Sequence, residues 1–300
     1  MITKYADFLK RHAPSWLYKL AAQSWIDYKF PRHLYIEVNQ FCNLQCEFCP
    51  REQLSNHMEY SLFQKIIDES SLYGPRSFSL HLFGEPFFWP HLFEGIRYIK
   101  ERNRKNTILL TTNGTLIERG NNLKKLLESP VDQVLWSWRK EAKFSEETKE
   151  RLRKWGKFRV RFIEEVTPPE AYKEWGNWPN QEGRPLHNYG GNVQLAKFQS
   201  LKSQTKTSME EIRWACHHLW LAPAVAWNGN FLLCCADPHQ KEVLGNVKET
   251  PIARLWQSER LNALREGQLA GQYGGICKDC DVWKAYPNLW FKFQKKTLKK

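Results

Sequence analysis

The chain has 300 residues, 42% of them hydrophobic, and a formal net charge of +13. This composition excludes a disordered chain, and the length allows one large or two medium domains. No stretch approaches the roughly 18 consecutive apolar residues of a membrane-spanning helix, and the N-terminus lacks the pattern of a signal peptide. We therefore expect a cytoplasmic protein whose eight cysteines are metal ligands or catalytic thiols, not disulfides.

Residues 1–33 have the pattern of one or two short amphipathic helices and are predicted to form an N-terminal extension. From Leu34 onward, short segments of alternating polarity alternate with amphipathic helical segments. The helical segments begin at Ser61, after Pro90, at Leu116 and at Ser145. The predicted strands are Leu34–Val38, Ser77–Phe83, Thr107–Thr112, Asp132–Trp138 and Phe158–Ile163, with a sixth near Asn192–Leu195.

Strands that alternate with helices predict a parallel sheet with βαβ crossovers. Five such units with a sixth strand suit a partial barrel rather than a closed eight-stranded one, with the functional loops at the carboxyl ends of the strands. The fold class that we predict is α/β: a partial (β/α)6 barrel over residues 34–200, followed by a small α+β unit over residues 201–300. In that unit, Asn228-Gly229 predicts a hairpin, a helix is expected over 252–269, and the chain ends in a basic tail.

The first group of cysteines, Cys42, Cys46 and Cys49, has the spacing C-x3-C-x2-C directly after the first predicted strand. Three thiolates on one loop can hold three irons of a 4Fe–4S cluster and leave the fourth iron open. A three-thiolate zinc site completed by His33 or His57 is the alternative, although neither histidine has the usual ligand spacing.

The strand followed by CNLQCEFCP resembles the signature of the radical S-adenosylmethionine superfamily. Phe83-Gly84-Glu85-Pro86 is similar to the family's G-G-E-P element, with Phe83 in place of its first glycine. Thr112-Asn113-Gly114-Thr115 and Ser137 match further elements at the ends of the third and fourth strands. The resemblance implies a 4Fe–4S cluster on Cys42, Cys46 and Cys49, and S-adenosylmethionine bound near Phe83, Gly84, Glu85, Pro86, Asn113 and Ser137.

The second group resembles part of the auxiliary-cluster domain called SPASM, in its truncated form named twitch. Its members Cys216, Cys234, Cys277 and Cys280 are separated by 18, 43 and 3 positions. The arrangement is similar to that of 2-deoxy-scyllo-inosamine dehydrogenases and of sulfatase-maturing enzymes, and it implies one auxiliary 4Fe–4S cluster, with structural zinc as the alternative. Cys235 is left over: it could be a buried inert thiol, replace Cys234 as a ligand, or face the substrate.

What the resemblance implies about activity is hydrogen abstraction by a 5′-deoxyadenosyl radical, with reduction by a flavodoxin or ferredoxin. With one auxiliary cluster, the expected outcome is oxidation of a small sugar-like or cyclitol substrate, and the net charge suits an anionic one. Modification of a peptide or protein is the main alternative, and a non-catalytic metal-binding interaction protein is the alternative of another class. We do not expect a nucleic-acid partner, because no recognisable RNA-binding module is present.

The catalytic base cannot be named from the sequence, and the weak candidates are His81, Cys235 and Asp237. Five other polar residues lie near late strand ends or in the loop beyond them, and we expect them to be salt-bridged or at the surface: Arg139, Arg159, Arg161, Glu164 and His187.

Overall fold

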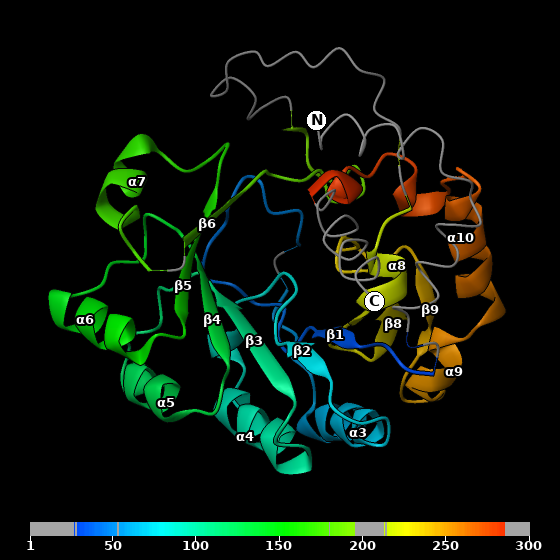
Figure 1. Cartoon of the computed structure of the whole chain (residues 1–300), viewed down its shortest axis with the longest axis horizontal. Helices are drawn as coiled ribbons and strands as arrows, with labels where there is room; N and C mark the ends of the chain where they lie inside the picture. The colour runs from blue at the N-terminus through cyan, green and yellow to red at the C-terminus, as the bar shows by residue number, and fades with distance from the viewer. Residues whose placement is uncertain are drawn as a thin grey trace, which may run out of the picture.

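The computed structural model describes residues 27, 29–52, 54–179, 181–195, 213 and 215–285. The expected helices of the N-terminal extension fall almost entirely outside these ranges, and so does the basic tail. Within them, the chain forms a nine-stranded sheet in the order β6-β5-β4-β3-β2-β1-β7-β8-β9, with helices packed against it (Figure 1).

The first six strands are parallel, and a helix connects each to the next. The strands are β1 (His33–Ile36), β2 (Ser77–Ser79), β3 (Thr107–Thr112), β4 (Gln133–Ser137), β5 (Phe158–Ile163) and β6 (Gln181–Arg184). The connecting helices are α3 (Tyr60–Ser71), α4 (Leu92–Arg102), α5 (Asn122–Glu128), α6 (Glu146–Trp155) and α7 (Pro169–Trp175). This is the predicted partial (β/α)6 barrel.

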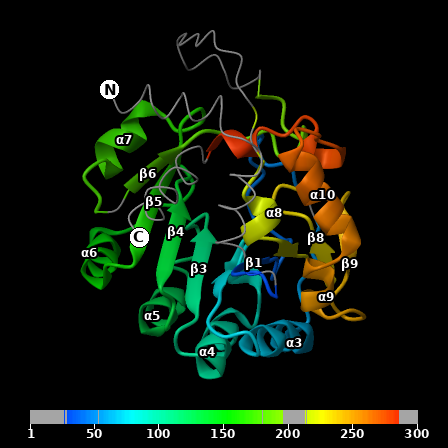
Figure 2. The ribbon, with the colours of Figure 1, turned by 45° about the vertical axis from the view of Figure 1, so that its right-hand side comes forward.

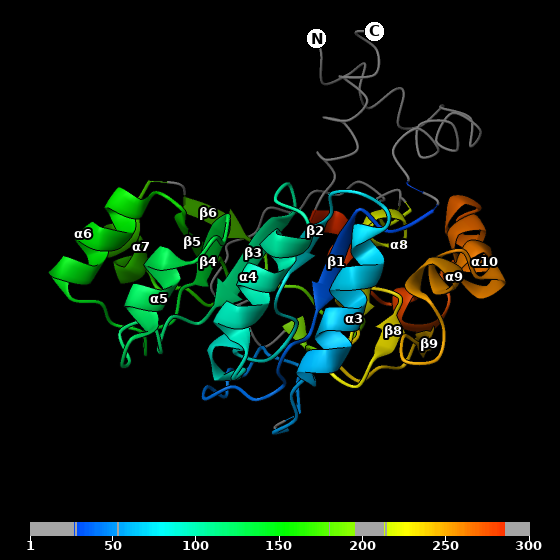
Figure 3. The ribbon, with the colours of Figure 1, turned by 90° about the horizontal axis from the view of Figure 1, so that it is seen from below.

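The alternation along the strands separates two faces of the sheet. Helices lie along the outer face of the barrel strands (Figure 3). That face is apolar: the Trp136 ring, for example, lies 4.7 Å from that of Trp175 on α7. In a parallel sheet that is covered on both faces, each strand is a nearly continuous run of hydrophobic residues. Here the inner face instead carries polar side chains such as Thr111, Ser137 and Arg161, and these residues line a cavity.

The C-terminal unit continues the same sheet. Strand β7 (Ala224–Val225) pairs in parallel with β1, and β8 (Asn230–Leu232) and β9 (Val243–Asn246) follow in antiparallel order, as predicted for the hairpin (Figure 2). The remaining elements are α8 (His218–Leu221), α9 (Ile252–Trp256), α10 (Glu259–Leu269) and two short 3₁₀ helices, η4 (Gly275–Cys277) and η5 (Val282–Ala285). The two units therefore share hydrogen bonds through β1.

Several details differ from the sequence prediction. Strand β2 ends at Ser79 and not at Phe83, and β1 is His33–Ile36 and not Leu34–Val38. The sixth strand is Gln181–Arg184 and not Asn192–Leu195, and α5 begins at Asn122 and not at Leu116. The helix expected over 252–269 is two helices, because the Ser258 hydroxyl accepts a hydrogen bond from the Leu261 amide and starts α10 anew.

Candidate active site

A cavity lies at the carboxyl ends of the six barrel strands, and the C-terminal unit closes one side of it. It is lined by residues that are far apart in the sequence. They include Cys42, Cys46 and Cys49 after β1, Glu85 after β2, Asn113 after β3, Ser137 on β4, Arg161 on β5, Arg184 on β6, and Cys235 and Ala236 after β8.

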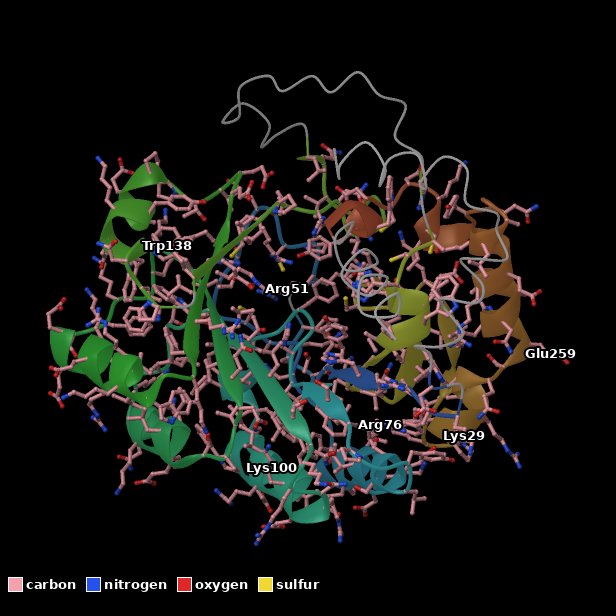
Figure 4. The ribbon with its side chains drawn as sticks, in the orientation of Figure 1. Lys29, Arg51, Arg76, Lys100, Trp138 and Glu259 are labelled. Atoms are coloured by element: carbon pink, nitrogen blue, oxygen red, sulfur yellow. The ribbon has the colours of Figure 1, made fainter. Side chains whose placement is uncertain are left out.

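The loop after β1 carries the first three cysteines into this cavity. Arg51 stabilises this loop, because its Nη2 donates hydrogen bonds to the carbonyls of Cys42 (3.2 Å) and Leu44 (2.5 Å). Figure 4 shows Arg51 in the middle of the molecule, between the barrel strands and the C-terminal unit. Burial raises the pKa of the Cys42 and Cys49 thiols, and the positive charge of Arg51 opposes that rise at both. Arg51 therefore both shapes the loop and favours its thiolates.

Asn113 connects the end of β3 to this loop. Its Nδ2 donates to the Cys42 thiol (3.4 Å) and to Asn43 Oδ1 (3.0 Å), while its Oδ1 accepts from the Thr115 amide (2.9 Å). Gly114 follows with φ +84, and a Cβ there would lie 2.5 Å from the Trp136 indole nitrogen, so only glycine fits. The T-N-G-T sequence is thus a turn that presents one amide to a cysteine ligand candidate.

Glu85 occupies the space between the ends of β2 and β3. Its carboxylate accepts hydrogen bonds from the Asn113 amide (2.7 Å) and the Thr112 hydroxyl (2.8 Å), and the side chain is 2% exposed. Burial raises the pKa of Glu85 to about 7, although these hydrogen bonds favour the charged form. The carboxylate faces the cavity with its geometry already fixed.

The other predicted cofactor-binding residues lie around Glu85. Gly84 is required by packing, because a Cβ there would lie 1.9 Å from the Asn39 carbonyl oxygen. Phe83 lines the cavity and meets the Tyr189 ring edge-on at 5.8 Å, while Pro86 is buried in the short helix η1 (Pro86–Phe88). Ser137 also lines the cavity, and its hydroxyl accepts from Arg139 Nη1 at 3.1 Å.

Two family models match these two parts of the chain. The model for the radical SAM superfamily matches residues 36–137, and the model for the SPASM iron–sulfur cluster-binding domain matches residues 216–281. The chain belongs to the radical S-adenosylmethionine superfamily. It is an enzyme of the type that carries a 4Fe–4S cluster with S-adenosylmethionine and, in a SPASM domain, an auxiliary iron–sulfur cluster.

Two curated relatives are similar to this radical SAM enzyme. The S-adenosyl-L-methionine-dependent 2-deoxy-scyllo-inosamine dehydrogenase of Niallia circulans is 24% identical over 82% of this chain and 91% of its own length. A tungsten-containing aldehyde ferredoxin oxidoreductase cofactor-modifying protein of Pyrococcus furiosus is 33% identical over 35% of this chain. That alignment spans only 30% of the Pyrococcus protein.

Two solved structures have the same fold. BtrN in complex with AdoMet and 2-DOIA superposes with a TM-score of 0.63 at 20% identity, covering 84% of this chain and 94% of BtrN. SuiB of Streptococcus suis bound to the precursor peptide SuiA has a TM-score of 0.62 at 17% identity, covering 86% of this chain and 71% of SuiB. Among the described residues, no helix is long and apolar enough to cross a membrane.

The donor sets in this radical SAM enzyme fit iron–sulfur clusters. All eight cysteines are free, and the first three face one cavity. In a cluster each thiolate binds its own iron, whereas a single ion gathers its ligands around one point. Among the described residues, no group of three or more His, Cys, Asp or Glu is arranged to hold a single metal ion.

The second set of cysteines lies behind the cavity wall. Burial raises the pKa of Cys277 to about 11, and the neighbouring Cys280 thiol adds to the rise. The pKa of Cys216 is also raised, first by burial and then by Cys280 and Cys277. Buried thiols that repel each other as thiolates become ligands when a bound cation balances their charge. Gln268 on α10 supports the site, because its Oε1 accepts from the Cys216 amide at 2.8 Å.

The structure separates the three catalytic candidates. His81 and Cys235 line the cavity, and the Cys235 thiol lies 3.9 Å from His218 Nδ1. Asp237 is fully buried and is not among the lining residues, because its carboxylate accepts from the Lys241 (2.9 Å) and Glu242 (2.8 Å) amides and closes a turn. His81 and Cys235 therefore lie at the site, whereas Asp237 stabilises the loop after β8.

Sequence reasoning missed several residues that line the cavity, namely Arg51, Arg184, Tyr189 and His218. Arg184 belongs to a strand whose sequence, Gln-Glu-Gly-Arg, has no hydrophobic alternation to reveal it. Arg139 and Arg161 were expected to be ordinary charged groups, yet both face the cavity. Along β5, Arg161 alternates with the apolar residues Val160 and Phe162, which face outward. This alternation was the signal that could have predicted an inward-facing Arg161.

Proposed function

We propose that this radical SAM enzyme catalyses the two-electron oxidation of a small sugar-like or cyclitol metabolite, from alcohol to ketone. One observation carries the proposal. The same cavity is lined on one side by Cys42, Cys46 and Cys49, and on the other by Cys235 and Ala236, which directly follow Cys234. A substrate in this cavity lies between the two cysteine groups.

When bound, the first cluster with S-adenosylmethionine supplies a hydrogen-abstracting radical, and the auxiliary cluster supplies an acceptor for the remaining electron. The chain would hold the first cluster on Cys42, Cys46 and Cys49, and the second on Cys216, Cys234, Cys277 and Cys280. Glu85 and the Asn113 turn are fixed beside the first site, where the cofactor's polar groups would lie. The C-terminal unit closes the cavity and limits access of water to it.

His81 is the proton acceptor that we propose. The position of His81 in the cavity supports this role. Burial and the charge of Arg161 lower the pKa of His81 to about 3, so its ring is neutral at neutral pH but is a weak base. Its Nδ1 is buried and has no hydrogen-bond partner in the part of the chain that the structure describes. Cys235 is the weaker candidate for a base, since burial raises its pKa to about 12 and it keeps its proton.

The relatives support an oxidation more than a peptide modification, without deciding the substrate. The dehydrogenase of Niallia circulans matches over nearly its whole length and names a cyclitol amine as its substrate. Peptide modification is the second candidate function, because the structure of SuiB that has the same fold holds a precursor peptide.

The test begins with anaerobic purification and reconstitution, followed by measurement of iron, sulfide and 5′-deoxyadenosine after addition of dithionite and S-adenosylmethionine. We expect about eight irons per chain and loss of 5′-deoxyadenosine in Cys42→Ala. Cys216→Ala should bind about four irons, whereas Cys235→Ala should still bind about eight. Zinc in place of iron, or reduced protein that never cleaves the cofactor, would contradict the proposal.

The substrate class is tested by adding 2-deoxy-scyllo-inosamine to the reconstituted enzyme. A cyclitol oxidase should form one ketone for each 5′-deoxyadenosine, and the yield of both should fall in His81→Ala. A rise in 5′-deoxyadenosine only with peptide, never with cyclitols or sugars, would favour the second candidate function.

A further inference from the structure

Arg213 binds the loop that carries the last two cysteines. Its Nη1 donates a hydrogen bond to the carbonyl of Lys278 at 2.7 Å, and its Nη2 donates to the carbonyl of Cys277. Both carbonyls belong to the C-x2-C segment that ends at Cys280. The guanidinium group therefore lies against the backbone that connects these two thiols.

Two aromatic rings lie against the same guanidinium group. Its central carbon is 3.9 Å from the centroid of the Tyr273 ring and 5.8 Å from that of the Trp283 ring. The Tyr273 hydroxyl also donates a hydrogen bond to the Arg213 carbonyl at 3.0 Å, so the ring and the arginine are fixed to each other. Rings that cover a cation shield it from water, and its charge then acts more strongly on neighbouring groups.

The charge of Arg213 acts on the two thiols of this loop. Burial raises the pKa of Cys277 and of Cys280, and the positive charge of Arg213 opposes the rise at both. Two carboxylates have the contrary effect, since Glu242 adds to the rise at Cys277 and Asp281 adds to it at Cys280. Arg213 therefore favours negative charge where these thiolates would hold a cluster.

The first cysteine loop is bound by an arginine in the same manner. There, Arg51 donates to the carbonyls of Cys42 and Leu44. The two arginines differ in position, because Arg51 lines the active-site cavity and Arg213 is not among the lining residues. Arg213 also precedes Cys216, where the match to the SPASM model begins. Its place beside the second cysteine group is thus a feature of the structure and not of the matched motif.

We propose that Arg213 raises the reduction potential of the auxiliary cluster and so makes it a better electron acceptor. The potential of an iron–sulfur cluster depends on the charge around it, and a nearby cation stabilises the reduced form, which is more negative. The inference rests on the proposed function, in which the cluster is held on Cys216, Cys234, Cys277 and Cys280. In that reaction, the substrate radical that remains after loss of a hydrogen atom and a proton gives one electron to this cluster and becomes the ketone.

The test is a reductive titration of the reconstituted full-length enzyme, followed by electron paramagnetic resonance. Addition of S-adenosylmethionine should change the signal of the first cluster, so the signal that stays unchanged reports on the auxiliary cluster. We expect a lower midpoint potential of the auxiliary cluster in Arg213→Gln, and a potential close to that of the wild type in Arg213→Lys, which keeps the charge. Lys278→Gln is the matched control. It removes a positive charge from the same loop, but this side chain is exposed to water, so the potential should not change.

An unchanged potential in Arg213→Gln would overturn the inference. Equal shifts in Arg213→Gln and Arg213→Lys would overturn it as well, because the hydrogen bonds and not the charge would then set the potential. Iron analysis covers the case in which a variant loses the cluster. Loss in Arg213→Gln alone still assigns the role to the charge, whereas loss in both variants shows that Arg213 only stabilises the loop and contradicts the inference.

The inference and the proposed function can fail separately, since the titration contains no substrate. If the potential depends on Arg213 but no ketone forms from 2-deoxy-scyllo-inosamine, the proposed oxidation is wrong and the role of Arg213 stands. If ketone forms and the potential does not depend on Arg213, only the inference is wrong. If both are correct, Arg213→Gln should form less ketone for each 5′-deoxyadenosine than the wild type does.

Discussion

Glu37, directly after β1, is a buried acid whose carboxyl group accepts one hydrogen bond within the described residues, from the Trp227 amide at 3.4 Å. Its side chain is 3% exposed, and burial raises its pKa to about 7. The folded chain therefore holds this proton more tightly than the unfolded chain does. As the pH rises from about 5 to 8, the folded protein must ionise a buried group, so its stability falls by about 3 kcal/mol.

Glu37→Gln should remove this pH dependence, because glutamine keeps the hydrogen-bond acceptor and carries no proton to lose. We expect the variant to match the wild type at pH 5 and to exceed it at pH 8. The measurement is urea unfolding of the full-length protein at both pH values. Glu259→Gln, at an exposed position on α10, should unfold like the wild type at each pH (Figure 4). Equal losses with pH in wild type and Glu37→Gln would disprove the assignment.

At the scale of single residues, the sequence predicted what short motifs can carry. The three cysteines after β1, Glu85 and Asn113 were predicted from their order along the chain, and the structure brings them to one cavity. The hydrogen bonds from Asn113 to Cys42 and Glu85 could not be predicted, since they depend on how the ends of β1, β2 and β3 converge. Arg184 belongs to no sequence motif, and only its place on β6 identifies it as a residue of the cavity.

At the scale of elements, α10 connects helix capping to the second cysteine group. Ser258 caps the start of the helix. Near its other end, the Gln268 side chain accepts a hydrogen bond from the Cys216 amide. Loss of an N-cap hydroxyl costs about 1 kcal/mol and frays the first turn. The cap therefore helps to hold Gln268 in place.

We predict that Ser258→Ala lowers both the stability of the protein and the iron retained after brief exposure to a chelator. Ser145→Ala is the matched control, because Ser145 caps α6 in the same way and lies in the barrel. It should lose similar stability and keep its iron. If both variants lose iron equally, the effect would be one of global stability and not of α10.

The elements that were predicted correctly share a strong local pattern. Strands β3 and β5 and helix α6 have the predicted bounds to within a residue, because their outward side chains alternate or recur cleanly. β6 was misplaced because it is a polar edge strand that contributes few side chains to the core. The break between α9 and α10 was missed because Ser258 lies within an otherwise helical period.

At the scale of the whole molecule, the nine-stranded sheet crosses the boundary predicted at residue 200. The amides of Tyr35 and Glu37 on the β1 side donate to the carbonyls of Pro223 (3.1 Å) and Val225 (2.9 Å) on the β7 side. No sequence signal could reveal this pairing, because it joins segments about 190 residues apart. The boundary between the units remains a prediction, but hydrogen bonds of one sheet span it.

We predict that the two units unfold together. In native-state hydrogen exchange, the amides of Tyr35 and Glu37 should be as slow as the Leu80 amide, which bonds to Leu109 (3.0 Å) inside the barrel. The Lys105 amide, in an exposed turn, is the fast-exchanging reference. Exchange of Tyr35 and Glu37 well before Leu80 would show that the C-terminal unit detaches on its own.

Strand β1 has a consequence for how such enzymes diverge. It leads directly into the loop of the first cysteines, and it pairs with the strand that begins the hairpin of the second group. The rate of electron tunnelling falls exponentially with distance, so the electron transfer proposed above would depend on a spacing that the pairing of β1 with β7 helps to set. A C-terminal unit exchanged between members of the superfamily would have to match the register of β1, or a chimera would lose the spacing between its redox centres.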